Sequence, residues 1–184
     1  MTAGRAQAHR ASALALGLAS VLLTGCAGLN VPAPGTGRAE LRNAAGVVVG
    51  TAIFTQVGSA LRVVLEVHDL PPGVKAVHVH EVGRCEGPAF TSAGGHFNPH
   101  GRQHGALNHP RGPHAGDLPN LTVAADGKGR LESTTELMSL DPEPGFVFDA
   151  DGSSIIVHAA PDDFRTDPTG NAGARIACGV IERT

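Results

Sequence analysis

The stretch Lys75-Ala76-Val77-His78-Val79-His80-Glu81 carries a signal for the fold and a signal for chemistry. Valine alternates with histidine, which is the period-two pattern typical of a β-strand. Residues i and i+2 of a strand project from the same face, so His78 and His80 can reach one metal ion together. A lone His-x-His pair also arises by chance in cores and on surfaces. A metal site therefore needs further ligands elsewhere in the chain.

Five further candidate ligands lie downstream. Four occupy a Gly/Pro-rich segment, 83–119, and one occupies a second strand-like run, 153–160. They are His96, His104, His114 and Asp117 in the first and His158 in the second. A long loop inside a compact domain usually means either function or disorder, and disorder would not need four ligands. With the His-x-His pair, these residues predict a site for two metal ions.

The two halves of this ligand set differ in chemistry. Imidazole binds copper and zinc, and several histidines with one carboxylate suit zinc. His104, His114 and Asp117 lie close together on one loop and can wrap a small ion with little strain. The three strand histidines come from two separate runs and form a stiffer, all-nitrogen site of the kind that copper accepts. His96 lies between the two sets, and its two ring nitrogens allow one ring to join two metals.

The rest of the chain predicts an all-β fold. No helical periodicity is convincing, and short alternating segments are separated by turn residues such as Asp126-Gly127. We expect eight strands, at 38–43, 47–56, 60–68, 75–82, 120–125, 130–137, 153–160 and 175–182, and two long loops, at 83–119 and 161–174. With no Trp or Tyr and six Phe, the core must consist of Val, Ile, Leu and Phe. Such a core suits two packed antiparallel sheets or a flattened barrel.

Residues 1–25 predict a bacterial lipoprotein signal peptide. Basic residues precede an apolar run at 11–23, and Leu23-Thr24-Gly25-Cys26 resembles the lipobox that is cleaved before cysteine. An ordinary secretory signal or an uncleaved membrane anchor is the alternative, but the run is short for a full span. Lipidation of Cys26 would hold the protein at a membrane surface, with each buried methylene worth about 0.8 kcal/mol. We therefore expect a lipid-anchored protein of the cell envelope that faces the periplasm.

The expected state of the two remaining cysteines follows from the lipoprotein assignment. Residues 26–37 carry the lipidated N-terminus and a Pro/Gly-rich run typical of a flexible tether, so the folded domain is expected over 38–184. With Cys26 lipidated, Cys85 and Cys178 can form one disulfide in an oxidising compartment, worth about 4 to 5 kcal/mol by loop-closure entropy. Two buried free thiols are the alternative. A disulfide would clamp the loop 83–119 to the last strand.

The charge balance weighs against one class of partner. Removal of residues 1–25, which carry two arginines and no acidic residue, leaves 12 basic and 17 acidic residues, a net charge of −5. A mildly acidic domain does not favour nucleic acid as a partner. It points to no particular substrate.

Six sequence motifs occur in order along the chain. They are Val77-His78-Val79-His80-Glu81, TSAGGHFNP at 91–99, His104-Gly105, His114-Ala115-Gly116-Asp117-Leu118, Ile156-Val157-His158 and TGNAGARIACGVI at 169–181. With them the chain resembles the copper/zinc superoxide dismutases, and specifically their bacterial lipoprotein branch, over residues 47–181. The resemblance implies an eight-stranded antiparallel Greek-key β-sandwich or flattened barrel whose two long loops carry the function.

The resemblance assigns ligands to both cofactors. The copper ligands would be His78, His80, His96 and His158, and the zinc ligands would be His96, His104, His114 and Asp117, with His96 as a bridging imidazolate. Asp162 would hydrogen-bond one histidine of each metal, His78 and His104, and so fix both rings. Arg175 would attract and orient the anion beside copper.

The implied activity is the dismutation of superoxide to dioxygen and hydrogen peroxide, which would protect the cell envelope. Copper would change its redox state in two one-electron steps, while His96 leaves and regains copper and passes a proton. Zinc would hold His96 in place and tune its proton affinity. Arg175 and His96 are thus the expected catalytic residues.

Three features depart from the family pattern. The stretch between His104 and His114 is one residue longer than in common eukaryotic members, and it contains His109, a rival ligand. The loop 163–170 lacks the Glu- and Lys-rich run that steers substrate in many members, so steering would be weaker or supplied by Arg102, Arg111 or Arg165. Bacterial relatives differ in whether they dimerise, so a homodimer remains an open expectation.

Two other functions compete with this one. A membrane-tethered copper or zinc binding protein without turnover would lack ligands or the arginine, but here the full set, including Asp162 and Arg175, is present. A zinc hydrolase would need an open zinc position and a general base, whereas four ligands close the expected zinc site.

Overall fold

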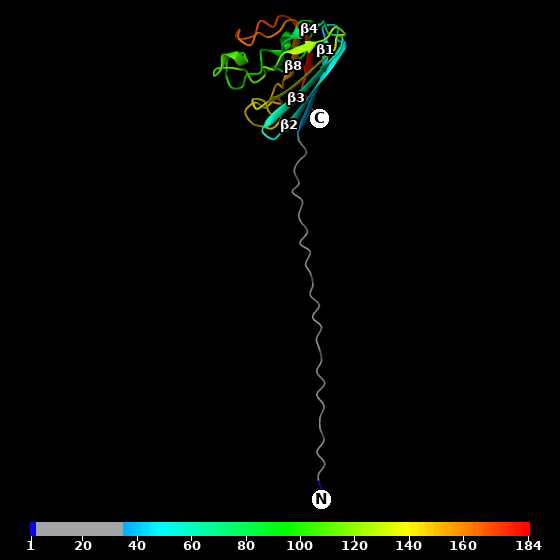
Figure 1. Cartoon of the computed structure of the whole chain (residues 1–184), viewed down its shortest axis with the longest axis vertical. Coiled ribbons are helices and arrows are strands. Elements are labelled where there is room, and N and C mark those ends of the chain that lie inside the picture. Colours follow the sequence, from blue (N-terminus) through cyan, green and yellow to red (C-terminus); the bar gives the residue numbers. More distant parts are fainter. Residues whose placement is uncertain (3–34) are drawn as a thin grey trace. The chain divides into compact units, whose positions relative to one another are not determined.

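The computed structural model describes residues 1–2 and 35–184, drawn in colour in Figure 1. Cys26 and almost all of the expected signal peptide and tether lie outside the described residues. The elements are β1 (Thr36–Asn43), β2 (Val48–Val57), β3 (Ala60–Val67), β4 (Gly73–Lys75), β5 (Val77–His80), η1 (Thr91–Ala93), η2 (Ala106–Asn108), β6 (Leu121–Val123), β7 (Gly129–Thr135), β8 (Ser154–His158), β9 (Arg175–Val180) and β10 (Glu182–Arg183). The first strand thus begins two residues before the expected start of the domain. Within the described part of the chain, no helix is long and apolar enough to cross a membrane.

The strands form one sheet that curls into a nearly closed barrel (Figure 1). Their order is β4-β6-β7-β3-β2-β1-β9-β8-β5, with β10 paired to β1, and all these strand pairings are antiparallel. The two strands at the ends of this order, β4 and β5, are consecutive in the chain and separated by Ala76 alone. Because β7, β6 and β4 are neighbours in turn and β3 lies beside β7, the arrangement is a Greek key. The all-β antiparallel prediction is confirmed.

Two of the eight predicted strands are each interrupted once, which gives ten. The predicted strand 75–82 divides at Ala76 because β4 pairs with β6 while β5 pairs with β8. Ala76 makes two hydrogen bonds at this break. Its N–H donates to Ala160 O at 2.8 Å, and its carbonyl accepts His158 N–H at 2.9 Å. The predicted strand 175–182 divides at Ile181, whose N–H donates to Ser153 O at 2.9 Å, and β10 then pairs with β1.

The interior of the barrel is apolar. Burial alternates along β3, where Leu61, Val63, Leu65 and Val67 point into the core. The same alternation on neighbouring strands produces one cluster of aliphatic and Phe side chains. Each fully buried side chain of this kind contributes about 1.5 to 3 kcal/mol relative to exposure. All residues of β5 and β8 are buried, and Val77, Val79, Ile155 and Val157 pack in this cluster, so both strands are rigid supports.

The two predicted long loops are present, and a third is added. Between β5 and β6 the chain forms only η1 and η2, and between β8 and β9 it forms no helix or strand. A third long connection, between β7 and β8, includes the segment 138–152 that separates two predicted strands, but it is not among the predicted long loops. It buries Met138, Leu140 and Val147 against the core, so it is a packed part of the barrel.

Cys85 and Cys178 form a disulfide, with their Cα atoms 5.6 Å apart. The bond joins the first long loop to β9 and packs with a small apolar cluster of Phe90, Ala93 and Ile156. The predicted pairing is confirmed, and the alternative of two free thiols is wrong.

Candidate metal centre

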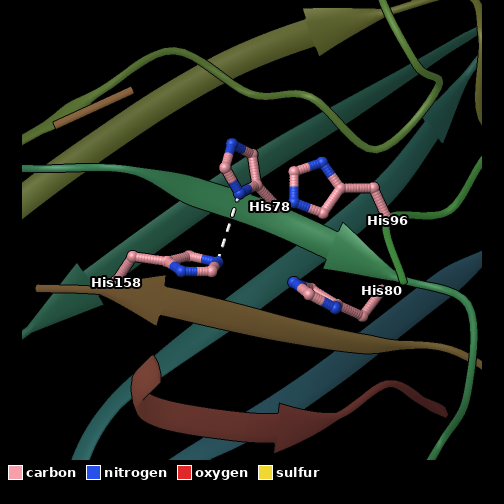
Figure 2. Close-up of side chains that lie close together, drawn as sticks. All are labelled: His78, His80, His96 and His158. Atoms are coloured by element: carbon pink, nitrogen blue, oxygen red, sulfur yellow. Dashed lines mark hydrogen bonds between the residues drawn. The ribbon is translucent and has the colours of Figure 1, made fainter. Parts of the chain in front are cut away.

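Four histidines gather at one side of the barrel (Figure 2). His78 and His80 come from β5, His158 ends β8, and His96 comes from the loop after β5. Their ligand nitrogens all lie within 4.8 Å of one another. We call these four residues the strand group.

The loop after β5 returns along the same strand and brings the other ligands with it. Val79 N–H donates to Gly116 O and Phe97 N–H donates to Val79 O, both at 2.9 Å. Single antiparallel bridges then pair His80 with His96 and His78 with Asp117. Residues far apart in the loop are therefore placed beside the two histidines of β5.

Hydrogen bonds determine which nitrogen most rings of the strand group present. His80 Nδ1 donates to Gly94 O at 3.1 Å, and His158 Nδ1 donates to Gly173 O at 3.3 Å. Because Nδ1 carries the proton in each ring, Nε2 carries a lone pair. His80 Nε2 is buried and has no hydrogen-bond partner. A buried nitrogen lone pair without a hydrogen-bond partner is able to coordinate a metal ion.

A second pair of rings shows the same fit for a cation. His78 Nε2 donates to Asp162 Oδ2 at 2.8 Å, so the lone pair of His78 is on Nδ1. That Nδ1 lies 3.2 Å from His158 Nε2, along the dashed line in Figure 2. Two lone pairs at this distance repel each other unless a proton or a metal ion lies between them. The strand group is thus an all-nitrogen set of ligands that could hold a cation.

A second group of ligands surrounds Asp117. Its Oδ1 lies 3.0 Å from His104 Nδ1, 3.1 Å from His96 Nδ1 and 3.4 Å from His114 Nδ1. Its Oδ2 accepts the backbone N–H groups of Gly105, at 2.8 Å, and of His114, at 3.0 Å, which fixes the carboxylate. Three imidazoles and one carboxylate are a donor set that zinc binds. We call His96, His104, His114 and Asp117 the loop group.

Two rings lie within reach of both groups. His96 presents Nδ1 to Asp117, while its buried Nε2 has no hydrogen-bond partner, so one nitrogen faces each group. The ring centroid of His78 is only 3.9 Å from that of His96, which also brings His78 within 4.8 Å of the loop group. Since Asp162 occupies one nitrogen of His78 and the other faces His158, we assign His78 to the strand group. His114, whose Nδ1 is 3.4 Å from His96 Nδ1, completes the loop group.

Asp162 connects the two groups. This buried carboxylate accepts from His78 Nε2 at 2.8 Å through Oδ2 and from His104 Nε2 at 2.9 Å through Oδ1. Asn120 holds it in place, accepting Asp162 N–H at 2.9 Å and donating to Asp162 O at 3.0 Å. One carboxylate therefore orients a ring in each group, which is a common arrangement around metal ligands.

Burial keeps several of the rings neutral. It lowers the pKa of His80 to about 2 and that of His158 to about 3. Burial also lowers the pKa of His96 to about 4, although Asp117 opposes the shift. A metal needs deprotonated ligands, so these three rings are ready to bind at pH 7.

His104 has the opposite shift. Burial by itself lowers its pKa, but hydrogen bonds to Asp117 and Asp162 outweigh burial and raise the pKa to about 9. Burial would raise the pKa of both carboxyls, yet the histidine hydrogen bonds hold each well below its usual range. Without a metal, the loop group therefore contains a protonated His104 between two carboxylates.

A cavity of about 800 Å³ opens beside the strand group. Arg175 lines it, with Nη1 donating to Phe90 O and Nη2 donating to Gly94 O, each at 2.6 Å. Because two carbonyls hold the guanidinium rather than a carboxylate, its positive charge remains available to an anion in the cavity. Arg102, Arg111 and Arg165, which the sequence offers as steering residues, are exposed and do not line the cavity.

The structure brings the predicted ligands, Asp162 and Arg175 into one region, and it adds partners that the sequence did not identify. His109, the rival ligand, is exposed and lies outside both groups. Asn120 and the carbonyls of Gly94 and Gly173 are additions. A backbone carbonyl leaves no signal in a sequence, because every residue has one.

A family model and several known proteins are similar to this chain. The sequence model of the family "Copper/zinc superoxide dismutase (SODC)" matches residues 48–181. Superoxide dismutase (Cu-Zn) 2 of Aquifex aeolicus is 45% identical over 145 residues, 78% of this chain and 84% of that protein. Superoxide dismutase (Cu-Zn) of Deinococcus radiodurans is 41% identical over 184 residues, covering 92% of this chain and 93% of its own. A crystal structure of a SOD-like protein from Bacillus subtilis superposes with a TM-score of 0.74 at 41% identity, covering 78% of this chain and 96% of that chain.

Proposed function

This chain belongs to the copper/zinc superoxide dismutase family, and we propose that it converts superoxide into dioxygen and hydrogen peroxide at the paired groups described above. It is accordingly an oxidoreductase that uses copper and zinc. The observation that carries the proposal is His96, which belongs to both groups and directs one nitrogen to each.

We assign copper to the strand group and zinc to the loop group. The four rings of the strand group offer only nitrogen, which suits copper, whereas the loop group adds a carboxylate, which suits zinc. The orphaned nitrogens of His80 and His96 and the facing lone pairs of His78 and His158 fit a bound cation. Copper supplies one-electron redox chemistry when bound, and zinc supplies a fixed positive charge.

The side chains around the metals have separate tasks. Arg175 attracts the superoxide anion into the cavity and orients it through its free charge. His96 Nε2 is a buried nitrogen without another partner, so it can hold a proton and deliver it to the reduced oxygen species. Asp162 keeps the rings of His78 and His104 in one tautomer and orientation.

We further propose that the enzyme is anchored to the cell envelope through lipidated Cys26 and faces the periplasm, after removal of residues 1–25 as a signal peptide. The lipobox-like Leu23-Thr24-Gly25-Cys26 supports this location, and a disulfide suits an oxidising compartment. Metabolic labelling with a fatty acid, compared between the natural chain and Cys26→Ser, tests the anchor. The family resemblance also allows a homodimer, which sedimentation of the purified domain would reveal.

The activity is tested with the domain beginning at Asn30, reconstituted with copper and zinc. We expect rapid, cyanide-sensitive dismutation that His158→Ala abolishes. His68→Ala is the matched control, because His68 is exposed and does not line the cavity, and it should retain full activity. Stoichiometric metal binding without turnover would instead support the alternative function, a copper or zinc binding protein without turnover. The complete ligand set and Arg175 do not favour that alternative.

A further inference from the structure

One carboxylate lines the cavity that an anion must enter. Glu81 follows β5 directly and is the only Asp or Glu among the lining residues, as Arg175 is the only Arg or Lys. A negative charge at this place repels superoxide and works against Arg175. Its position calls for a structural explanation.

Glu81 binds both backbone groups of Gly95. Its Oε1 accepts Gly95 N–H at 2.8 Å, and its own N–H donates to Gly95 O at 3.0 Å. Its side chain also lies against Gly94, since a Cβ added to Gly94 would be 2.8 Å from Glu81 Cγ and Oε1. Gly94 has a φ of 73°, a conformation that glycine adopts readily. Glu81 thus fixes the turn 94–96 on one side.

Two functional side chains depend on this turn. The carbonyl of Gly94 accepts His80 Nδ1–H at 3.1 Å and Arg175 Nη2–H at 2.6 Å. A displaced Gly94 would therefore rotate a ring of the strand group and move the guanidinium at the same time. The third residue of the turn is His96, the ligand shared by both groups.

We propose that Glu81 is a positioning residue for the dismutation reaction. The Glu81 carboxylate holds Gly95, and the turn 94–96 then sets the orientation of His80 and Arg175. The negative charge of Glu81 slows the approach of superoxide. This inference rests on the proposed function for its effect on rate, but its effect on the copper ligands can be measured separately.

Two substitutions separate the hydrogen bond from the charge. Glu81→Gln retains an acceptor oxygen for Gly95 N–H and removes the charge, whereas Glu81→Ala removes both. Glu136→Gln is the matched control, because Glu136 is exposed and does not line the cavity. Each variant is made in the full chain, loaded with copper and zinc, and compared by the copper electron paramagnetic resonance spectrum and by kcat/KM at several salt concentrations.

We expect Glu81→Gln to keep the natural copper spectrum and to gain about twofold in kcat/KM at low salt, with the gain lost when screening is strong. Glu81→Ala should alter the spectrum and lower kcat/KM by about tenfold, because a misplaced partner of a metal ligand typically has an effect of that size. Glu136→Gln should match the natural chain in both measurements.

An unchanged copper spectrum in Glu81→Ala would overturn the positioning role. A Glu81→Gln variant as damaged as Glu81→Ala would also overturn it, since the hydrogen bond would then not be what matters. If the natural chain binds copper but does not turn over, the proposed function fails. The positioning of His80 would still be supported by a spectrum that Ala alters and Gln restores.

Discussion

The strand group and the loop group both present imidazole nitrogens but are held in place differently. Three rings of the strand group stand on β5 and β8, two paired strands packed on the apolar core. All four ligands of the loop group come from one connection, where a buried carboxylate and hydrogen bonds replace core packing. A site on paired strands has its geometry before the metal arrives, whereas a site on a loop depends on its charged partners. The two groups should therefore respond differently to substitution and to pH.

The largest effect should follow replacement of Asp117 by Ala. We expect zinc binding to be lost and the free energy of unfolding to fall by about 3 to 5 kcal/mol, because His104 loses a charged partner and two backbone N–H groups lose their acceptor. Copper binding should be retained. Metal analysis measures the bound zinc and copper, and urea unfolding measures the free energy of unfolding. Asp141→Ala is the control, because Asp141 is exposed. Equal loss of both metals would contradict the independence of the strand group.

The carboxylate shared by the two groups should have the next largest effect. An amide at position 162 offers one acceptor oxygen, so Asp162→Asn directs an NH₂ group toward the Nε2–H of either His78 or His104. We expect the affinity for both metals to fall by about 10- to 100-fold, with zinc affected more. Competition with a chelator measures each affinity. A loss of affinity confined to copper would show that the strand group, and not the loop group, depends more on Asp162.

The two groups should also differ in their pH dependence. The pKa of His104 is raised to about 9 in the absence of metal, so the charged ring stabilises the metal-free protein below about pH 6.5, and this contribution is lost as pH rises through 9. Zinc must displace that proton, and its affinity should therefore rise about tenfold per pH unit between pH 6 and 8.

His80 and His158, whose pKa values are lowered to about 2 and about 3, are neutral in this range and keep the lone pair on Nε2, so they should add no pH dependence to copper binding. Calorimetry in buffers of different ionisation enthalpy should detect about one proton released per zinc. Zinc binding that is independent of pH would show that His104 is neutral before the metal binds.

The smallest effect is expected for the rival ligand. His109 is exposed and outside both groups, so His109→Ala should leave zinc affinity within about twofold and stability within about 0.5 kcal/mol. Zinc titration and thermal unfolding provide the readouts. A tenfold loss of zinc affinity would return His109 to the ligand set in place of His114.

The residues that gather in the two groups could be predicted from the sequence because most of their signals are local. The period of two places His78 and His80 on one side of a strand, and the order of the motifs assigns Asp162 and Arg175 by their positions. The break at Ala76 could not be predicted in the same way. Residues 75–82 form one alternating run, and the pairings that divide it involve β6 and β8, which lie far along the chain.

The supports of the ligands were harder to identify than the ligands themselves. His80 and His158 are oriented by backbone carbonyls, and the role of Glu81 depends on the path of a loop that no local pattern specifies. The packing of the connection between β7 and β8 could not be predicted for a related reason. Its buried Met138, Leu140 and Val147 pack without regular secondary structure, so they have no period to detect.

The single-residue step at Ala76 also bears on aggregation. An open sheet presents unpaired N–H and C=O groups to which another chain can add a strand. Here the sheet returns on itself across Ala76, β4 is three residues long, and the second side of β5 is bonded to Phe97 and Gly116 of the metal-bearing loop. A folded molecule thus offers little template for strand addition on this side. Detachment of that loop would expose the N–H and C=O groups of Val79, so the loop that carries the metal ligands also covers an edge to which another strand could add.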